Sequence, residues 1–324
     1  MIFINCVKNL IIKKLSILSI YCLQRGKRIV TEKHIDFKVN YKKLNIFEEY
    51  NTKDMAYPIV LSSPHSGKLF PQEFLENCAL SEYELRSSED CFVDEIILEA
   101  SNAGIPMIAM NIPRTFVDVN RDKIEIDETM YFDCKKPQDL IGSRRCRVGL
   151  GVIHRIVSQN KAIYDGLISH KEVMERIKYV YEPYHKRLKQ LIDKCYRKFG
   201  FCLLIDCHSM PSKICNIMNE AKPVEFCVCT LFDESCPTSM SEFFGKELAN
   251  KDYRVEYNRP YAGAFITFNY CQPRKNIFTL QLEINRSLYM IEETYKKNVH
   301  FQDVSKHICD SIINLGKFLL DFKK

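Results

Sequence analysis

Short apolar runs alternate with longer amphipathic segments along most of the chain. Five of these runs are too short to be helices and predict strands, over residues 57–62, 105–110, 201–206, 225–231 and 277–284. Strands that alternate with helices are typical of βα units built around a mainly parallel sheet. We therefore predict an α/β fold.

Capping signals mark the helices between these strands. Four helices are predicted, over residues 90–102, 169–198, 239–250 and 304–322. Ser169 and Glu172 have capping-box spacing at the start of the second helix, which ends at Gly200. Ser239 and Glu242 have the same spacing and predict the start of the third helix.

The chain has no repeat, low-complexity tract or linker, so we predict one catalytic domain over residues 41–324. Residues 1–40 form a basic extension that could be disordered. Its apolar stretch LSILSIYCL is far shorter than the roughly 20 residues that span a membrane. The stretch imitates part of a signal peptide, but no small-residue cleavage site follows it. We expect no membrane segment and a cytoplasmic protein.

The net charge of +6 is concentrated at the N-terminus. Residues 1–54 contain 11 Lys or Arg and 5 Asp or Glu, which accounts for the whole excess. The remaining chain is neutral, so we do not expect its folded body to bind nucleic acid. A binding role of the basic tail itself stays open.

Fifteen cysteines are scattered along the chain without a C-x-x-C pair. The odd count and the spacing fit neither a disulfide scaffold nor a zinc ribbon. Several cysteines lie inside apolar runs, where a free thiol packs as a small hydrophobic side chain. This usage indicates a reducing compartment.

Two histidines follow predicted strands directly. His208 lies in LLIDCHSMPS and His65 in SSPHSG, each at the carboxyl end of a strand. In open α/β sheets ligands bind at this edge, so the two side chains could converge on one crevice. Each histidine taken alone could equally be a hydrogen-bonded structural residue.

A catalytic zinc site typically needs a third ligand, a carboxylate, and leaves one position for water. The nearest carboxylates after His65 belong to Glu73, Glu76, Glu89, Asp90 and Asp94. The spacing H-x-x-E lands on Lys68, which cannot bind a metal while charged. Asp90 precedes a predicted helix and could instead cap it or interact with its dipole.

Arg114, Asn120 and Arg121 lie in IPRTFVDVNRD, after another predicted strand. Arginine binds carboxylates through two parallel hydrogen bonds, so two arginines near a metal indicate an acidic substrate group. Surface ion pairs with Asp118 or Asp122 are an equally good explanation.

Glu283 lies among apolar residues on the last predicted strand and shares a face with Gln281. A charged side chain is rarely buried without a partner. Glu283 could be the general base beside a metal, or it could pair with Arg286.

Other polar residues carry weaker signals. His154 follows a glycine pair and is a minor catalytic candidate. We expect the helical histidines to be solvated or capping residues, namely His170, His185, His300 and His307. No P-loop or G-x-S-x-G elbow is present, which disfavours nucleotide-binding and serine-hydrolase functions.

Several segments together resemble the N-formylglutamate amidohydrolase family, whose members are similar in fold to zinc carboxypeptidases and aspartoacylase. The segments are SPHSG, EDCFVDEI, PRTFVDVNR, GLGVIHR, YHKRL, LLIDCHSMPS, RPYAGAFIT and LQLEINRSLYM. They occur in the family's order and span roughly residues 57–290.

The resemblance implies a three-layer α/β/α sandwich of the phosphorylase/hydrolase type, with a mixed, mostly parallel sheet and one zinc ion. His65 and His208 match metal ligands, and Asp90 is the preferred third ligand over Glu89 and Asp94. Other divalent metals are possible in the same site.

The same resemblance assigns roles around the metal. Glu283 matches the general base and Arg114 the arginine that polarises the carbonyl group. Asn120 and Arg121 match the pair that binds a substrate carboxylate. One departure is Ala264, which replaces an expected second glycine in the loop YAGAF.

The implied reaction is zinc-dependent hydrolysis of N-formyl-L-glutamate to formate and L-glutamate, a step of histidine degradation. The implied partner is a small N-acyl amino acid; the sequence does not show the oligomeric state. Another N-acyl amino acid or a small peptide could be the substrate. A metal-binding relative without activity is the alternative outside enzymes.

Overall fold

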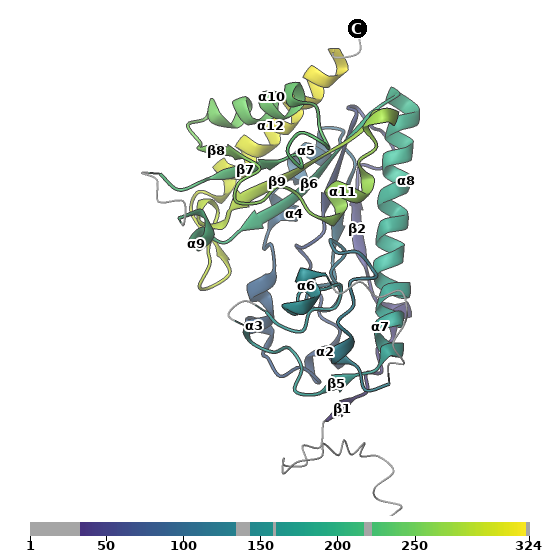
Figure 1. Ribbon diagram of the computed structural model, residues 1–324. Coiled ribbons are helices and arrows are strands. Elements are labelled where there is room, and N and C mark those ends of the chain that lie inside the picture. The colour runs from purple at the N-terminus through teal and green to yellow at the C-terminus, as the bar shows by residue number, and fades with distance from the viewer. Residues whose placement is uncertain (1–32, 134–142, 158–159, 217–221, 322–324) are drawn as a thin grey trace, which may run out of the picture.

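The computed structural model describes residues 33–133, 143–157, 160–216 and 222–321, and a seven-stranded mixed sheet lies at their centre (Figure 1). In order across the sheet the strands are β2 (Phe47–Tyr50), β4 (Met107–Met110), β3 (Ile59–Ser63), β6 (Cys202–Met210), β9 (Ile277–Asn285), β7 (Phe226–Cys229) and β8 (Val255–Tyr257). The four strands from β4 to β9 run parallel, whereas β2 and β7 run antiparallel to their neighbours β4 and β9. The predicted α/β class with a mostly parallel sheet is confirmed.

Alternate side chains of the strands enter two separate hydrophobic cores. Val60 and Leu204 face one core, whereas Leu61 and Ile205 face the other. Helix α8 (Glu182–Phe199) covers the first side, together with α11 (Phe265–Tyr270). The second side is covered by α4 (Val93–Ile96), α5 (Leu98–Asn102), α10 (Thr238–Ala249) and α12 (Phe301–Asp321). Figure 1 shows α8 and α12 on opposite sides of the sheet, which makes three layers.

All five predicted strands occur, but β6 and β9 extend further than predicted. The predicted strand over 201–206 continues to Met210, because residues 207–210 pair in register with β9 although polar residues interrupt their apolar run. His208 is thereby paired with Glu283 on the neighbouring strand. The extension thus places two candidate site residues side by side.

The helices differ from the predictions in their boundaries and caps. The long helix consists of α7 (His170–Arg176), a π-helical turn (Ile177–Tyr181) and α8. Ser169 caps it by accepting a hydrogen bond from the backbone of Glu172. The capping box predicted at Ser239 is wrong, because α10 begins at Thr238 after Pro237 and has no side-chain cap.

Two further helix boundaries differ from the predictions. The predicted helix over 90–102 begins only at Val93 and is interrupted at Ile97, which gives α4 and α5. Helix α12 begins one turn before the predicted start at residue 304, since Phe301 is buried in the core and continues the apolar face of the helix.

Short elements complete the described part of the chain. They are β1 (His34–Ile35), β5 (Leu167–Ile168), β10 (Met290–Ile291), β11 (Lys296–Lys297), α2 (Gln72–Leu75), α3 (Glu82–Leu85), α6 (Arg144–Arg147) and α9 (Ser212–Cys215). Five 3₁₀ turns accompany them, at Tyr41–Lys43, Arg86–Ser88, Glu128–Met130, Pro273–Lys275 and Arg286–Leu288.

The predicted extension over residues 1–40 lies mostly outside the described residues. Its last part is described: β1 pairs with β5, and Ile35 and Phe37 are buried against the body. The apolar stretch after Lys14 is not described. Among the helices that are described, none combines the length and apolar character needed to cross a membrane. The cysteines in the described ranges are free thiols, most of them buried.

His185 on α8 is not solvated, contrary to the sequence-based expectation. Its Nε2 donates to the carbonyl oxygen of Val119 at 2.8 Å, and its Nδ1 lies 2.8 Å from the hydroxyl of Tyr270. Both nitrogens are therefore satisfied in the neutral ring. Burial lowers the pKa of His185 to about 4.

His185→Gln should make the stability less sensitive to acid. The unfolded chain takes up a proton at the ordinary pKa of about 6.5, whereas folded His185 resists protonation until about pH 4. Its contribution is complete above pH 6.5 and is lost as the pH falls toward 4, by up to about 2 kcal/mol between pH 7.5 and 5. Urea unfolding of both proteins at the two pH values measures this difference. An equal loss of stability in the variant would show that His185 does not titrate in this way.

Candidate metal and catalytic site

A cavity of about 380 Å³ opens beside the carboxyl ends of β3, β6 and β9. All seven site residues predicted from the sequence line it, namely His65, Asp90, Arg114, Asn120, Arg121, His208 and Glu283. Side chains from distant parts of the chain therefore meet at the sheet edge where α/β folds bind ligands.

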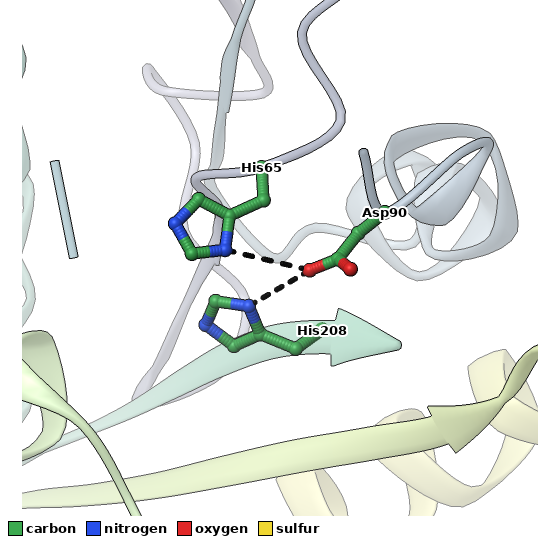
Figure 2. A group of neighbouring side chains, drawn as sticks. All are labelled: His65, Asp90 and His208. Atoms are coloured by element: carbon green, nitrogen blue, oxygen red, sulfur yellow. Dashed lines mark hydrogen bonds and ion pairs between the residues drawn. The ribbon is translucent and has the colours of Figure 1, made fainter. Parts of the chain in front are cut away.

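His65, Asp90 and His208 form a compact buried group (Figure 2). One ligand atom from each residue lies within 4.8 Å of the others. Asp90 Oδ2 is 3.5 Å from His65 Nδ1 and 3.0 Å from His208 Nδ1. The Asp90 carboxylate thus faces the Nδ1 atom of each histidine ring.

The opposite nitrogen of each ring is held by a second carboxylate. His65 Nε2 lies 2.7 Å from Asp118 Oδ1, and His208 Nε2 lies 2.8 Å from Asp206 Oδ2. A hydrogen on each Nε2 donates to these carboxylates, which turns both Nδ1 atoms toward Asp90. Metal-binding histidines are usually oriented by this kind of carboxylate contact.

The three residues fit a zinc ion or a similar divalent metal. Two imidazoles and one carboxylate form a typical catalytic zinc set. His65 Nδ1 is buried and has no hydrogen-bond partner among the described residues, as expected of a nitrogen whose partner is a metal. Of the two alternative third ligands, Glu89 instead accepts hydrogen bonds from Arg86, and Asp94 lies outside the group.

Asp90 is oriented by partners outside the group. Its Oδ1 accepts hydrogen bonds at 3.0 Å from Arg286 and from Ser209, which leaves Oδ2 facing the histidines. The alternative of a helix cap does not apply, because Phe92 occupies the N-cap position of α4. Arg286 therefore pairs with Asp90 and does not neutralise Glu283.

The charges in this group are strongly coupled. Burial raises the pKa of Asp90, but the adjacent His208 and His65 rings and the charge of Arg286 outweigh it and hold that pKa well below its ordinary value. Burial lowers the pKa of His208, but Asp206, Asp90 and Glu283 together raise it well above the ordinary value. A metal ion must displace the proton of His208, so higher pH favours metal binding.

Asp118 is the central carboxylate that the sequence prediction missed as a site residue. It is fully buried and contacts His65, the guanidinium of Arg114 at 2.7 Å, His154 at 3.0 Å and the backbone N–H of Asn120 at 2.8 Å. The pair with Arg114 was foreseen only as a surface ion pair. The position of Asp118 between two valines in FVDVN was the available signal for a buried carboxylate.

His154 belongs to the site, although the sequence marked it only as a minor candidate. Its Nε2 donates to Asp118, and the ring is buried. Burial lowers the pKa of His154 to about 4, against the opposing effect of Asp118. The ring is therefore neutral at physiological pH and supports Asp118 as a hydrogen-bond donor.

Glu283 lies close to the predicted ligands. Its Oε1 accepts a hydrogen bond from Gln281 Nε2 at 2.7 Å, whereas Oε2 has no hydrogen-bond partner among the described residues. Burial, and after it the negative charge of Asp90, raise the pKa of Glu283 to about 7, against the opposing charge of His208. A carboxylate with a pKa near neutrality and one free oxygen is suited to accept a proton.

The two predicted carboxylate-binding residues have different environments. Arg121 donates through Nε to Leu150 and through Nη1 to the carbonyl of Asn120. Its Nη2 makes no hydrogen bond within the described residues and lies 3.9 Å from Asp118 Oδ2, so its hydrogens can reach a ligand. Asn120 is buried, and its Oδ1 accepts from Ile266 N–H at 2.8 Å while Nδ2 lies 3.3 Å from Asp206. Arg121 is therefore the more available donor.

Ala264 causes no backbone strain in the loop that lines the cavity. Its φ of −131° and ψ of −160° are extended values that any residue adopts. The preceding Gly263 has a φ of +127°, where a side chain would be strained and would also approach Leu231. The loop thus needs one glycine, and the chain has it.

The chain is similar to known proteins over most of its length. A model of the N-formylglutamate amidohydrolase family matches residues 57–290. An N-formylglutamate deformylase of Pseudomonas putida is 25% identical over 267 residues, which cover 80% of this chain and 93% of that enzyme. A protein of the same name from Pseudomonas aeruginosa is 24% identical over 242 residues, covering 73% and 83%. The crystal structure of N-formylglutamate amidohydrolase from Ralstonia eutropha JMP134 superposes with a TM-score of 0.80 and 28% identity, over 85% of this chain and 99% of that one.

Asp118→Asn should weaken zinc binding by about 10- to 100-fold, because an amide no longer accepts from His65 with a full charge. Competition with a chromophoric chelator measures the affinity of the purified protein. Asp122→Asn is the matched control, since Asp122 lies in the same loop and its side chain accepts, within the described residues, a hydrogen bond from the backbone N–H of Ile124 alone. Equal affinities of the two variants would contradict the role of Asp118.

Proposed function

The chain belongs to the N-formylglutamate amidohydrolase family, and on this premise we propose that it hydrolyses the formyl amide of N-formyl-L-glutamate to formate and L-glutamate with the help of one zinc ion. The family match confirms the resemblance drawn from sequence motifs and the expectation of an amidohydrolase. Zinc dependence and the roles of individual residues are part of the proposal.

The observation that carries the proposal is the position of Glu283 beside the His65, Asp90 and His208 group. Three buried atoms of the cavity-lining residues lack hydrogen bonds within the described residues, namely His65 Nδ1, His154 Nδ1 and Glu283 Oε2. A simple structural ion-pair cluster would leave few such atoms unsatisfied in one place. A metal with a water molecule would supply partners for His65 Nδ1 and Glu283 Oε2.

The residues divide the chemistry among them. A zinc ion bound by His65, Asp90 and His208 would acidify a water molecule and polarise the amide carbonyl group. Glu283 accepts the proton of the attacking water and returns it to the departing nitrogen, which leaves as the amine of glutamate. Its raised pKa makes both transfers feasible near neutral pH.

Arg114 stabilises the negative charge that develops on the carbonyl oxygen. Its Nε and Nη2 are bound to Asp118, so the guanidinium is fixed and Nη1 is left to donate into the cavity. A preoriented donor costs no reorganisation when the charge develops. Asp118 therefore supports both the metal site and the oxyanion site.

Arg121 binds the α-carboxylate of the substrate through its free Nη2 hydrogens. Asn120 contributes by keeping Arg121 and Asp206 in place. Its backbone carbonyl oxygen accepts a hydrogen bond from Arg121, and its side-chain amide nitrogen lies beside Asp206. The substrate is then held with its formyl group at the metal and its amino-acid part toward the arginines.

Glu283→Gln should lower formate release from N-formyl-L-glutamate by about 100- to 10,000-fold while zinc stays bound. Glutamine preserves the shape and the contact with Gln281 but cannot accept the proton. Zinc-loaded wild type is assayed with N-acetylglutamate and N-acetylaspartate as alternative substrates, and Glu242→Gln on the exposed face of α10 is the control. If the wild type cleaves only an acetyl substrate, the proposed substrate would be an N-acetyl amino acid and not N-formyl-L-glutamate. If the Glu283→Gln variant remains active, Glu283 is not the general base.

The pH dependence should show an acid limb from Glu283. Its pKa is raised to about 7, and only the deprotonated carboxylate can act as a base. Because the positive charge of a bound metal favours the carboxylate, the midpoint is expected at or below about pH 7, with kcat/KM falling about tenfold per unit at lower pH. Initial rates between pH 4.5 and 9 test this, with zinc content measured at every pH. A profile that rises as the pH falls through this range would contradict the assignment.

A further inference from the structure

Arg145 lines the cavity together with Arg114, Arg121 and Arg286. Arg145 belongs to α6 and has an exposed side chain at the cavity wall. Within the described residues its guanidinium makes no hydrogen bond or ion pair. The other cavity arginines all have a carboxylate nearby: Asp118 lies 2.7 Å from Arg114 and 3.9 Å from Arg121, and Asp90 lies 3.0 Å from Arg286.

Arg145 and Arg121 are both hydrogen-bonded to the backbone of Leu150. The N–H of Leu150 donates to the carbonyl oxygen of Arg145 at 2.8 Å, and the carbonyl oxygen of Leu150 accepts from Arg121 Nε at 3.0 Å. The two arginines are therefore held on the same wall of the cavity through one residue.

Helix α6 is anchored despite its short length. Ser143 accepts a hydrogen bond from the backbone of Cys146, and the Cys146 side chain is buried. A side chain at Gly151 would approach Cys146 Sγ to 3.1 Å and the backbone oxygen of Glu125 to 2.3 Å, so the following loop packs directly against the helix. Arg145 thus extends from a fixed base.

The cavity carries positive charge that its own carboxylates do not neutralise. Burial, and after it the charges of Arg114 and Arg145, lower the pKa of Arg121 to about 10, against the opposing charge of Asp118. The effect of Arg145 on Arg121 reflects their proximity. An anionic ligand between the two guanidinium groups would relieve this repulsion.

We propose that Arg145 binds the side-chain carboxylate of the substrate while Arg121 binds the α-carboxylate, so that Arg145 selects N-formyl amino acids with an acidic side chain. The inference rests on the proposed function, because it places a substrate in the same cavity. In glutamate three carbon atoms separate the two carboxylates, which matches two neighbouring arginines on one wall. A guanidinium that has no carboxylate partner within the protein can bind a substrate carboxylate through two parallel hydrogen bonds without breaking an existing ion pair.

The test compares two substrates of nearly equal shape, N-formyl-L-glutamate and N-formyl-L-glutamine. In Arg145→Gln, kcat/KM for the glutamate substrate should fall about 10- to 100-fold, mainly through KM. The value for the glutamine substrate should change less than about twofold. The preference of the wild type for glutamate would then be lost.

Arg144→Gln is the matched control, because Arg144 is exposed on the same short helix and does not line the cavity. It should retain the wild-type preference. An Arg145→Gln variant that keeps this preference, or that loses activity equally on both substrates, would overturn the assignment of Arg145.

Calorimetric titration with L-glutamate and L-glutamine separates this inference from the proposed function. Zinc-loaded wild type should bind L-glutamate more tightly than L-glutamine, and Arg145→Gln should bind the two alike. A wild type that releases no formate but shows this Arg145-dependent preference would refute the proposed reaction and support the carboxylate site. Formate release without any Arg145-dependent preference would support the proposed reaction and refute the carboxylate site at Arg145.

Discussion

The buried carboxylate of Asp118 is the charge on which the whole site depends. A charge removed from water must be compensated by several close partners, and Asp118 has an imidazole on each side, an arginine and a backbone N–H. These partners come from the end of β3, from its own loop and from the loop at residues 149–154. Compensation of one charge therefore fixes the relative positions of the metal ligand His65, the oxyanion donor Arg114 and the wall that carries Arg121.

The parallel pairing of β6 with β9 provides the second constraint. Because His208 and Glu283 lie opposite each other in the register, the candidate ligand and the candidate base are separated by one interstrand distance. A slip of β9 by one residue would turn Glu283 toward the opposite layer, away from His208. The apolar residues that precede them on each strand fill the two cores and oppose such a slip.

The sequence predicted those features that local pattern determines. The inner strands are buried on both faces and appear as apolar runs, whereas β2 and β8 lie at the sheet edges, are half exposed and contain glutamates, so no run marks them. His65 and His208 could be identified because each follows an apolar run that marks a strand. The supporting residues Asp118 and His154 could not be identified in this way. They are 36 residues apart in the sequence and meet only because the intervening loop folds back. The resemblance assigned Asn120 to substrate binding; in the structure Asn120 lines the cavity, and its amide also contacts Ile266 N–H and Asp206.

The position of β9 in the sheet affects how the protein is made. This strand is the last of the seven in the chain, yet it lies between β6 and β7. While the ribosome has not yet released residues 277–285, the facing edges of β6 and β7 have no partner, and the side chains of both strands are ones that the finished fold buries. Open strand edges of this kind pair readily with other chains. The nascent protein thus carries a risk of aggregation until residues 277–285 have left the ribosome, and insertion of β9 closes the sheet and delivers Glu283 to the site in the same event.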